Sequence, residues 1–503
     1  MKVYLLGAGP GDPDLLTIKA REILAKADVI VYDALASVQL LSHCRKDAEL
    51  LYVGKVAGNH ALPQPEINAL LIAKAREGKT VARLKGGDPY IFGRGGEEAQ
   101  ALLAAGIGFE EVPGISSTIA APAYAGIPLT HRDLVSSVTL ITGHEKAEKD
   151  HSSLNWQALA QSGSTLVFVM GMKNLPHISA RLITAGLDPQ TPSALIYRGT
   201  TAAQRSLAAP LKDLPALAEK AHFTNPSVIV VGHVVSLRQE LNWFEQRPLF
   251  GKSIVVTRAR EQASDIVAGF SELGAEVIQC PTIQIRALPD TTNLDSAISN
   301  LAKYGWVFFT SANAVAFFWK RLEALGFDAR KFGNVSICAI GPGTAKALAA
   351  HGLKADLMPK RFVAESLVED FLTLHADTQL PILLPRAKQA RELLPESLKA
   401  KGYQVDVIPC YETVPDSSQV SLVTERLEAG KLSCITFASS STVRNFLTLI
   451  SPDTLRSHPE VQLAAIGPVT AKTLEEAGLP CHIQPETYTI SALITAVKNA
   501  LHN

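Results

Sequence analysis

The sequence predicts an α/β protein made of two halves, each composed of two lobes. Short apolar runs at 3–6, 29–31 and 50–53 alternate with helix-like segments, which is the rhythm of layered α/β folds. A segment at 245–251 contains proline and glycine and precedes a fresh strand start, so it indicates a linker. The residues after it repeat themselves, which predicts two copies of one α/β unit.

Composition excludes several classes of protein. The chain has 503 residues, enough for three or four domains, and its formal net charge is zero, which gives no support to a nucleic-acid partner. No apolar run reaches the roughly 18 to 20 residues that span a bilayer, and the first strand is too short for a signal peptide. The six cysteines are scattered, so we expect free, mostly buried thiols in a cytoplasmic protein. No Cys/His cluster has metal spacing, and we expect no metal.

Two glycine-rich stretches follow strands in the first half. The turn at 7–14 reads Gly-Ala-Gly-Pro-Gly-Asp-Pro-Asp, and its third glycine comes one position too early for a dinucleotide fingerprint. The stretch at 83–98 carries five glycines between a strand and a helix start, and neither stretch contains the Gly-Lys-Ser/Thr of a P-loop. This density favours a ligand-binding loop over an ordinary connection.

Each stretch contains an aspartate, Asp12 or Asp88, where a phosphate site would need donors. Acidic groups suit a ligand with cationic parts, and S-adenosylmethionine carries both a sulfonium and an ammonium group. The alternative for each aspartate is a helix N-cap.

Charged residues also close strands in the first half. Asp33 and Lys55 each follow an apolar run, and the carboxyl ends of strands are where α/β sheets place ligands. The alternative is a solvated loop charge. A later turn at 112–118 supplies two hydroxyls, Ser116 and Ser117, shortly after the point where the first lobe should give way to the second.

Residues 1 to about 240 closely resemble the tetrapyrrole methylase family, and within it the uroporphyrinogen-III C-methyltransferases. The matching motifs stand at 7–12, 86–98, 113–116, 126–132 and 225–227. The resemblance implies lobes at about 1–113 and 114–244, S-adenosylmethionine in the cleft between them, and a possible homodimer through this half. No dinucleotide-binding domain precedes Met1, so oxidation and iron insertion are not expected.

The resemblance also implies roles for individual residues. The proton acceptor falls on Asp33 and the proton donor on Lys55. The cofactor contacts fall on Pro10, Gly86, Gly87, Asp88, Ile91, Ser116, Ser117, Met170 and Gly199. The tetrapyrrole substrate bears eight carboxylates, so guanidinium groups should line its pocket. The candidates are Arg94, Arg132, Arg198 and Arg205.

The second half contains an internal repeat. Residues 339–353 match 465–479, residues 309–313 match 437–441, and residues 254–258 match 382–386. Two similar lobes imply a cleft between them, which is a usual place for a ligand. Each copy places Ile-Gly-Pro-x-Thr at a helix start. We expect hydroxyls and free amides to point at the cleft from Ser311, Thr344, Ser439 and Thr470.

This cleft suits a polycarboxylate, because helix N-termini bind anions and Arg258 and Arg386 each stand at the end of a strand. N-capping alone remains the alternative for the hydroxyl residues. Residues 252–503 resemble uroporphyrinogen-III synthase at 256–258, 309–313, 411–413 and both Ile-Gly-Pro-x-Thr motifs. The resemblance implies interleaved lobes, one made of 252–282 plus 414–503 and the other of 283–413.

That family closes hydroxymethylbilane into a ring with inversion of ring D and loss of water. Tyr411 matches the tyrosine thought to help the hydroxyl leave; the alternative is a half-buried strand tyrosine. The sequence thus predicts a bifunctional enzyme of the sirohaem and cobalamin branch, which makes uroporphyrinogen III and methylates it at C2 and C7 to give precorrin-2. Two alternatives stay open: another precorrin or diphthine methylase in the first half, and a catalytically silent tetrapyrrole-binding module in the second.

Overall fold

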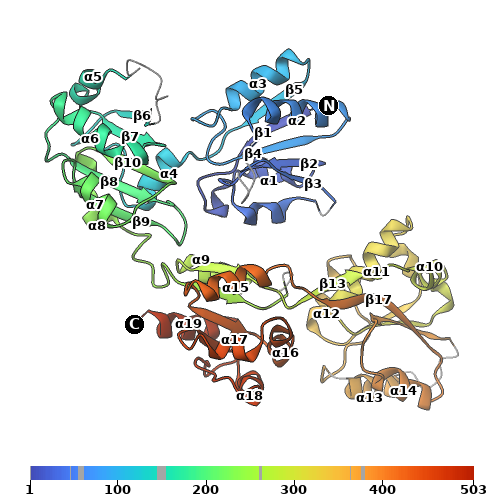
Figure 1. Ribbon diagram of the computed structural model, residues 1–503. Coiled ribbons are helices and arrows are strands. Elements are labelled where there is room, and N and C mark those ends of the chain that lie inside the picture. The colour runs from blue at the N-terminus through green and yellow to red at the C-terminus, as the bar shows by residue number, and fades with distance from the viewer. Residues whose placement is uncertain are drawn as a thin grey trace.

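The computed structural model describes residues 2–45, 47–54, 62–143, 154–259, 263–362, 364–374 and 380–502. Their strands form four separate sheets, two from the first half of the chain and two from the second (Figure 1). Among these residues, no helix combines the length and the apolar character needed to cross a membrane.

The first sheet is parallel throughout. Its strand order is β3 (Glu49–Tyr52), β2 (Val29–Tyr32), β4 (Val81–Lys85), β1 (Lys2–Gly7) and β5 (Gly108–Val112). Its helices are α1 (Ile18–Leu24), α2 (Gln64–Arg76) and α3 (Gly95–Ala104), with 3-10 turns η1 (Pro13–Leu15) and η2 (Val38–His43). A separate apolar cluster packs on each face of the sheet, which is why its strands read as near-continuous apolar runs.

The second sheet is mixed: β6 and β7 are parallel, whereas β10 is antiparallel to both of its neighbours. Its order is β6 (Val138–Thr142), β7 (Thr165–Val169), β10 (Ser227–Val231), β8 (Pro192–Tyr197) and β9 (Arg205–Pro210). The associated helices are α4 (Ser117–Tyr124), α5 (Trp156–Gln161), α6 (Leu175–Thr184), α7 (Leu214–Lys220) and α8 (Arg238–Leu241), with η3 (Met172–Asn174) and η4 (His233–Leu237).

The third sheet joins segments from the two ends of the second half. Its order is β12 (Glu276–Gln279), β11 (Ser253–Val256), β18 (Cys434–Phe437) and β19 (Gln462–Ala465), all parallel. Its helices are α9 (Ser264–Glu272), α15 (Val420–Glu428), α16 (Ser440–Leu449), α17 (Pro452–Arg456), α18 (Pro468–Glu476) and α19 (Ile490–Leu501).

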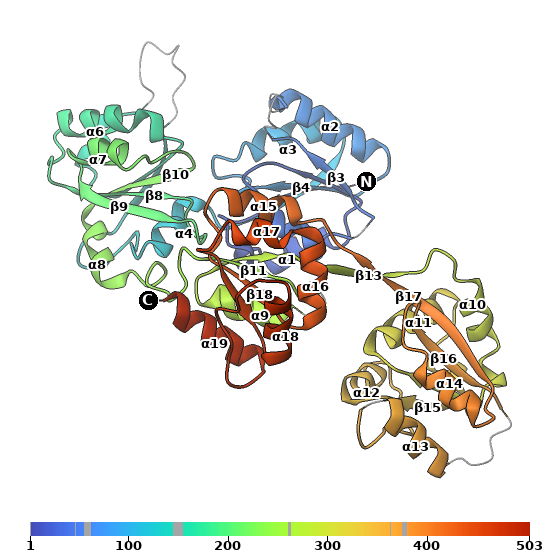
Figure 2. The same ribbon diagram turned by 60° about the horizontal axis from the view of Figure 1, so that its bottom comes forward.

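The fourth sheet uses the middle of the second half. Its order is β13 (Ile283–Ala287), β17 (Val405–Pro415), β16 (Ile382–Ala387), β14 (Trp306–Phe309) and β15 (Ser336–Ala339). Its helices are α10 (Thr292–Ser299), α11 (Ala312–Ala324), α12 (Pro342–Ala349), α13 (Ala364–Leu374) and α14 (Leu393–Ala400), with η6 (Leu301–Lys303) and η7 (Ala329–Phe332). The antiparallel pair β13 and β17 runs from this lobe toward the other, as Figures 1 and 2 both show.

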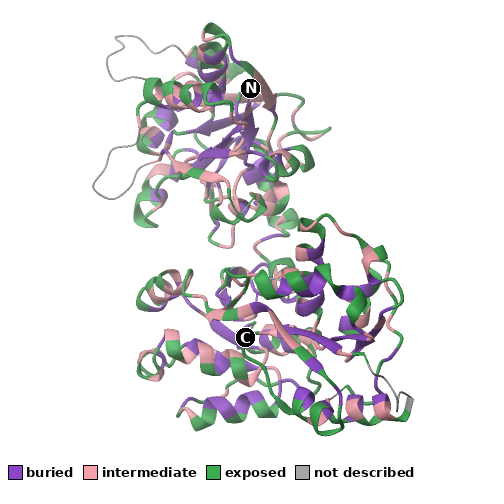
Figure 3. Ribbon diagram, turned by 90° about the vertical axis from the view of Figure 1, so that its right-hand side faces the viewer, coloured by how far each residue is buried: buried purple, intermediate pink, exposed green. Residues whose placement is uncertain are grey.

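The internal repeat reappears as matching topology. The order β12-β11-β18-β19 corresponds strand for strand to β17-β16-β14-β15. Even an isolated bridge is duplicated, with Cys338 paired to Leu357 in one lobe and Ala464 to Ile483 in the other. In both halves the buried residues follow the strands and the inner helix faces, and exposed residues cover the outside (Figure 3).

The predicted linker at 245–251 is attached at both ends. The Glu245 carboxylate accepts hydrogen bonds from Ser206 Oγ at 2.6 Å and Gln204 Nε2 at 2.8 Å, and it pairs with Arg238. At the other end, Leu249 is fully buried in a core cluster of the third sheet, and its amide donates to Leu273 O. The connection between the halves is therefore anchored to both of them.

Candidate active sites of the two halves

The glycine-rich loops of the first half meet at the carboxyl edge of the first sheet. Gly9 and Gly87 exchange backbone hydrogen bonds, with Gly87 N to Gly9 O at 2.7 Å and Gly9 N to Gly87 O at 3.2 Å. A Cβ on Gly7 would overlap the backbone of Gly114, and a Cβ on Gly114 would overlap the carbonyl of Gly87. Three loops thus pack backbone against backbone, which only glycine permits.

Both aspartates of these loops are hydrogen-bonded within the protein. Asp88 Oδ1 accepts from Tyr90 N at 2.8 Å and Ile91 N at 3.1 Å, and Oδ2 accepts from Gly114 N at 3.0 Å. Asp12 Oδ1 accepts from Asp14 N at 3.0 Å, which makes it the N-cap of η1. The alternative of an N-cap therefore holds for Asp12 but not for Asp88, which accepts from amides of its own loop and from Gly114. Both carboxylates fix the conformation of the loops.

The two lobes of the first half contact each other through the first loop. Asp12 Oδ2 accepts a 2.8 Å hydrogen bond from Tyr124 Oη at the end of α4, and Asp12 N donates to Thr200 Oγ1 at 3.1 Å. Gly199 lies so close to α4 that a Cβ there would overlap the side chain of Ala121. The loop after β1 is therefore held against two segments of the second lobe.

Strained backbone marks the same region. Phe92, Arg94, Met170, Arg198 and Thr200 all have positive φ values although none is glycine. Such residues persist only where the surroundings enforce them, and they cluster at ligand sites. Met170, expected to contact the cofactor, follows β7 with φ at 56° and a half-exposed side chain.

Most of the expected cofactor contacts lie together. A Cβ on Gly87 would lie 3.7 Å from Ser116 Cα and 3.8 Å from Ser117 N, so the second loop faces the start of α4. Ser116 caps that helix, and Ser117 is its first residue. Gly86 packs on Leu35, Ile91 is exposed, and Pro10 belongs to the loop that contacts Gly87. Among the described residues, no hydrogen bond joins Met170 to this group.

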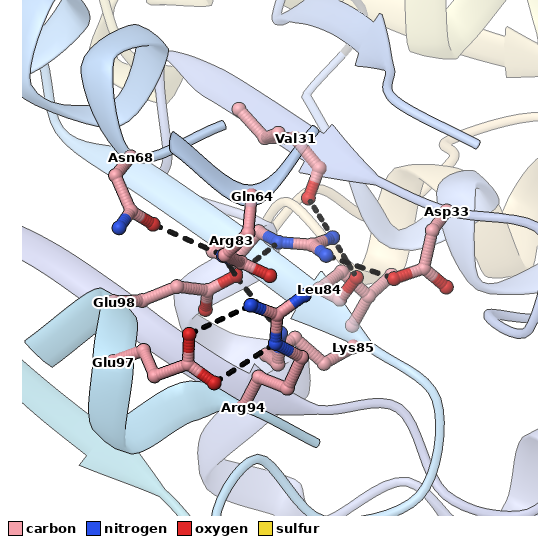
Figure 4. Close-up of polar contacts among 10 residues, drawn as sticks. All are labelled: Val31, Asp33, Gln64, Asn68, Arg83, Leu84, Lys85, Arg94, Glu97 and Glu98. Atoms are coloured by element: carbon pink, nitrogen blue, oxygen red, sulfur yellow. Dashed lines mark hydrogen bonds and ion pairs between the residues drawn. The ribbon is translucent and has the colours of Figure 1, made fainter. Parts of the chain in front are cut away.

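Asp33 stands at the end of β2 and belongs to a buried charged network (Figure 4). Its Oδ1 accepts from Leu35 N at 3.1 Å, and its Oδ2 accepts from Arg83 Nη2 at 2.9 Å. Behind Arg83 lie Lys85 and Glu98, both buried. Sequence reasoning missed these three charges. The available signal was the pair of cations at alternate positions of an otherwise apolar strand, β4. Lys55, the expected proton donor, lies outside the described residues.

The four arginine candidates differ in their surroundings. Arg132 and Arg198 are exposed, whereas Arg94 forms a 2.7 Å ion pair with Glu97. Arg205 donates to the carbonyls of Ala221 and His222 beyond the end of α7, so its guanidinium is already bound to the protein. Lysine and arginine side chains bind the free carbonyls at helix C-termini, which explains its position.

In the second half, Tyr411 and Ser311 meet although they are distant in sequence. Ser311 Oγ lies 3.2 Å from Tyr411 Oη and also caps α11 by accepting from Ala314 N at 3.0 Å. The Tyr411 ring is 7% exposed and stacks on Phe317, with centroids 5.5 Å apart. Burial raises the pKa of the Tyr411 phenol, so it stays protonated at neutral pH.

The helix starts that the repeat matches between the two lobes have their serines as N-caps, but their threonines are buried. Ser439 caps α16 in a capping box with Thr442, the counterpart of Ser311 on α11. Thr344 and Thr470 occupy the third positions of α12 and α18, but each is only 4% exposed. The expectation that these two hydroxyls stand open at the cleft is therefore corrected, because both residues are packed into the protein.

Arg386 and Arg258, which stand at the ends of matching strands, have different surroundings. Arg386 pairs with Glu392 and donates to Arg391 O at 3.0 Å, and its residue is 8% exposed. A neighbouring carboxylate thus holds part of its guanidinium, and Arg386 Nε is buried with no hydrogen-bond partner among the described residues. Its role as a substrate donor stays a prediction. Arg258, its repeat counterpart just after β11, is half-buried. Among the described residues, no group of three or more His, Cys, Asp or Glu is arranged to hold a metal ion.

Comparison with known proteins assigns each half to a family. Residues 2–215 match the family model of tetrapyrrole (corrin/porphyrin) methylases, and residues 264–495 match that of uroporphyrinogen-III synthase HemD. The porphyrin biosynthesis protein HemD of Ruminiclostridium josui is 37% identical over 98% of this chain and 96% of its own length.

Other relatives match the first half or extend beyond it. The uroporphyrinogen-III C-methyltransferase of Bacillus subtilis is 42% identical over 73% of both chains. The S-adenosyl-L-methionine-dependent uroporphyrinogen III methyltransferase of Methanosarcina barkeri is 53% identical over 49% of this chain and 96% of its own. A solved uroporphyrin-III C-methyl transferase of Thermus thermophilus, complexed with S-adenyl homocysteine, is 36% identical and covers 47% of this chain and 100% of its own, with a TM-score of 0.41. The chain belongs to the family of tetrapyrrole biosynthesis proteins that join a tetrapyrrole methylase to a uroporphyrinogen-III synthase of the HemD type.

Proposed function

We propose that the second half cyclises hydroxymethylbilane to uroporphyrinogen III and that the first half transfers two methyl groups from S-adenosylmethionine to C2 and C7, giving precorrin-2. The observation that carries this proposal is the presence of both family matches in one chain, with a relative that is 37% identical over 98% of it. A synthase and a methylase of its product are consecutive steps, so their fusion is functionally coherent.

The methyl transfer requires positioning above all. A pyrrole carbon attacks the sulfonium methyl, a C–C bond forms, the C–S bond breaks, and the sulfur keeps the electron pair as S-adenosylhomocysteine. The macrocycle then loses a proton. Holding the two reactants in line can supply several kcal/mol of the barrier. The interlocked loops of Gly9, Gly87 and Gly114 support this role, because their tight backbone packing makes a rigid surface for the cofactor.

We place the cofactor in the cleft between the two lobes of the first half, against Pro10, Gly86, Gly87, Asp88, Ile91, Ser116, Ser117, Met170 and Gly199. Asp33 is the proton acceptor in this proposal, because it is the member of the buried network with appreciable exposure, at 25% of its side chain. Lys55 remains the proposed donor. Arg94, Arg132, Arg198 and Arg205 are the proposed contacts for substrate carboxylates.

In ring closure, the terminal hydroxyl leaves as water while a C–C bond forms between the two end pyrroles. We assign Tyr411 to protonation or hydrogen bonding of that hydroxyl, since its phenol is kept neutral by burial and oriented by Ser311. Arg258 and the helix starts at Ser311 and Ser439 would bind the carboxylates. Arg386, Thr344 and Thr470 remain proposed substrate contacts, the two threonines through the starts of α12 and α18 to which they belong.

The domain limits stay a proposal as well: methyltransferase at 1–244, linker at 245–251 and synthase at 252–503. The partition of the strands supports these limits and the interleaved lobes, because in the described part of the chain no sheet takes strands from both halves. The six cysteines are all free, which supports a cytoplasmic location. A homodimer through the first half is proposed from the family alone, and light scattering would measure it.

One incubation tests both activities. Hydroxymethylbilane, S-adenosylmethionine and the full chain are combined under reducing conditions, and the products are analysed by isomer separation and mass. The expected product is a dimethylated type III macrocycle. If only the type I isomer accumulates, the synthase assignment fails and the second half is a binding module. If type III forms but gains one methyl group or none, the C2/C7 assignment fails. Asp88→Ala should weaken cofactor binding and leave ring closure intact.

A further inference from the structure

A fully buried carboxylate, Glu98, lies directly behind Asp33 in the first lobe. Its Oε1 accepts hydrogen bonds from Lys85 Nζ at 2.9 Å, Gln64 Nε2 at 3.1 Å and Arg83 Nε at 3.3 Å (Figure 4). Its Oε2 is buried with no hydrogen-bond partner among the described residues. A charged group with an unsatisfied buried oxygen is costly, so a structural purpose alone would be better served by an apolar side chain.

Arg83 connects this carboxylate to Asp33. Its side chain is 4% exposed, and one guanidinium contacts Glu98 through Nε and Asp33 through Nη2. Its third nitrogen, Nη1, donates to Leu84 O at 3.0 Å and Val31 O at 3.4 Å. The planar guanidinium is thereby fixed on every side, and a fixed guanidinium fixes the carboxylate bound to it.

Exposure increases along the network in one direction. The side chains of Glu98, Arg83 and Lys85 are 0%, 4% and 5% exposed, whereas Asp33 is 25% exposed. The two cations, Arg83 and Lys85, balance the two anions, Glu98 and Asp33. The network of four residues therefore has no net formal charge, and its only carboxylate that solvent or substrate can reach is Asp33, at the end.

We propose that Glu98 and Arg83 are positioning residues for methyl transfer: Glu98 holds the Arg83 guanidinium, and Arg83 holds the Asp33 carboxylate in the orientation that accepts the proton. This inference rests on the proposed role of Asp33. Lys85 belongs to the same unit, and burial followed by the nearby Arg83 charge lowers its pKa, so its ammonium depends on Glu98. The cofactor loops are held by the bonds of Asp88, by the Gly9–Gly87 backbone pair and by the backbone bond from Ala8 N to Lys85 O, none of which uses the side chain of Arg83 or Glu98.

The first test separates binding from turnover. Glu98→Gln keeps the size of the side chain and removes its charge, and Arg83→Met removes the guanidinium. Each variant should bind S-adenosylhomocysteine within about twofold of the natural protein, with KM for uroporphyrinogen III changed by less than about threefold. Their kcat should fall by about 100-fold, the scale at which a misplaced group affects catalysis. Arg83→Lys should recover part of kcat. Glu49→Gln, which removes an equivalent charge from the surface pairs with Lys74 and Lys79, is the matched control and should keep full kcat.

The second test asks whether Arg83 acts through Asp33. The variant Asp33→Asn should lose most of kcat, and adding Arg83→Met to it should cost less than about threefold more, because residues that act as one unit are not additive. If the losses of kcat in Asp33→Asn and Arg83→Met multiply in the double variant, the proposal is overturned. Full kcat in Glu98→Gln would overturn it as well. Failure of the underlying function looks different, since then the natural protein itself would not methylate uroporphyrinogen III. Thermal denaturation and ring closure by the same samples show whether each variant is folded.

Discussion

Ser311 Oγ and Tyr411 Oη lie 3.2 Å apart, although 100 residues separate them in the chain. Ser311 starts α11, and Tyr411 lies in β17, one of the two strands that run between the lobes of the second half. Their contact therefore places a phenol of the core of the fourth-sheet lobe beside the N-terminus of α11. In the proposed function, the N-terminus of α11 would bind a substrate carboxylate, and the neutral Tyr411 phenol would donate a proton to the departing hydroxyl.

Replacement of Tyr411 by phenylalanine removes only the phenol hydroxyl and keeps the ring stacked on Phe317. We expect the rate of type III formation to fall about 100-fold, the lower range for loss of a general acid. Ser311→Ala should reduce that rate only a few-fold but destabilise the second half by about 1 kcal/mol, since it removes an N-cap. Methylation of supplied uroporphyrinogen III is the control and should not change. Full ring-closure activity in Tyr411→Phe would exclude the phenol from catalysis.

The pH profile gives an independent check of the same phenol. Burial raises the pKa of Tyr411 above its ordinary value of 10, with the Ser311 hydrogen bond opposing this more weakly. The protonated form is the donor, and a raised pKa keeps that form populated to higher pH. Type III formation should therefore show no loss attributable to Tyr411 between pH 7 and about 9. An alkaline decline centred below pH 9 that disappears in Tyr411→Phe would contradict this assignment.

The contact between Asp12 and Tyr124 yields a prediction about cofactor affinity. Tyr124→Phe removes the 2.8 Å hydrogen bond that fixes the first loop against α4. We expect S-adenosylhomocysteine to bind several-fold more weakly and the first half to lose about 1 kcal/mol of unfolding free energy. Tyr304→Phe is the matched control, because it removes a 2.9 Å tyrosine–aspartate bond to Asp406 in the second half. Calorimetric titration of the two variants should show weakened binding in the first alone, and equal affinities would disconnect the contact from the cofactor.

Much of the fold followed from pattern, and the repeat is the clearest case. Matching segments at 254–258 and 382–386 predicted two similar lobes, and the structure gives them the same strand order. The loops at 7–14 and 83–98 were predicted to bind a ligand, and the structure shows them paired at Gly9 and Gly87. Motif spacing works here because tight glycine turns and helix starts depend on neighbouring residues.

The sequence alone does not reveal which charged side chains are buried. Arg83, Lys85 and Glu98 carry charges that a sequence pattern assigns to a solvated face, yet they are paired with one another and with Asp33 inside the lobe. Arg386 looked available for a substrate, but Glu392, six residues later, holds it. Whether a charge is free or paired depends on contacts set by the tertiary fold, and neither the alternate cations of β4 nor the spacing of Arg386 and Glu392 specifies these contacts by itself.

The six cysteine thiols differ in solvent accessibility: four are buried and two are partly exposed. Burial raises the pKa of Cys44 to about 11 and that of Cys280, Cys338 and Cys410 to about 12. The thiolate is the reactive form, so at pH 8 the folded protein should be labelled slowly, and first at the partly exposed Cys44 and Cys481. The remaining four thiols should react only after denaturant is added. Fast labelling of Cys410 in the folded protein would show that the second half opens locally at β17.

Gly199 and Gly96 differ in the space that surrounds them. Gly199 lies against α4, and a Cβ there would overlap Ala121, so Gly199→Ala must push the loop after β8 away from the helix. We expect a loss of about 1 to 3 kcal/mol in stability and at least a tenfold loss of S-adenosylhomocysteine affinity, because overpacking shifts backbone. Gly96 in the first turn of α3 has no atom within 4 Å of an added Cβ, so Gly96→Ala should be neutral or slightly stabilising. Denaturation curves of both variants measure the change in stability, and titrations with S-adenosylhomocysteine measure the change in affinity. Normal affinity in a folded Gly199→Ala protein would remove the loop after β8 from the cofactor site.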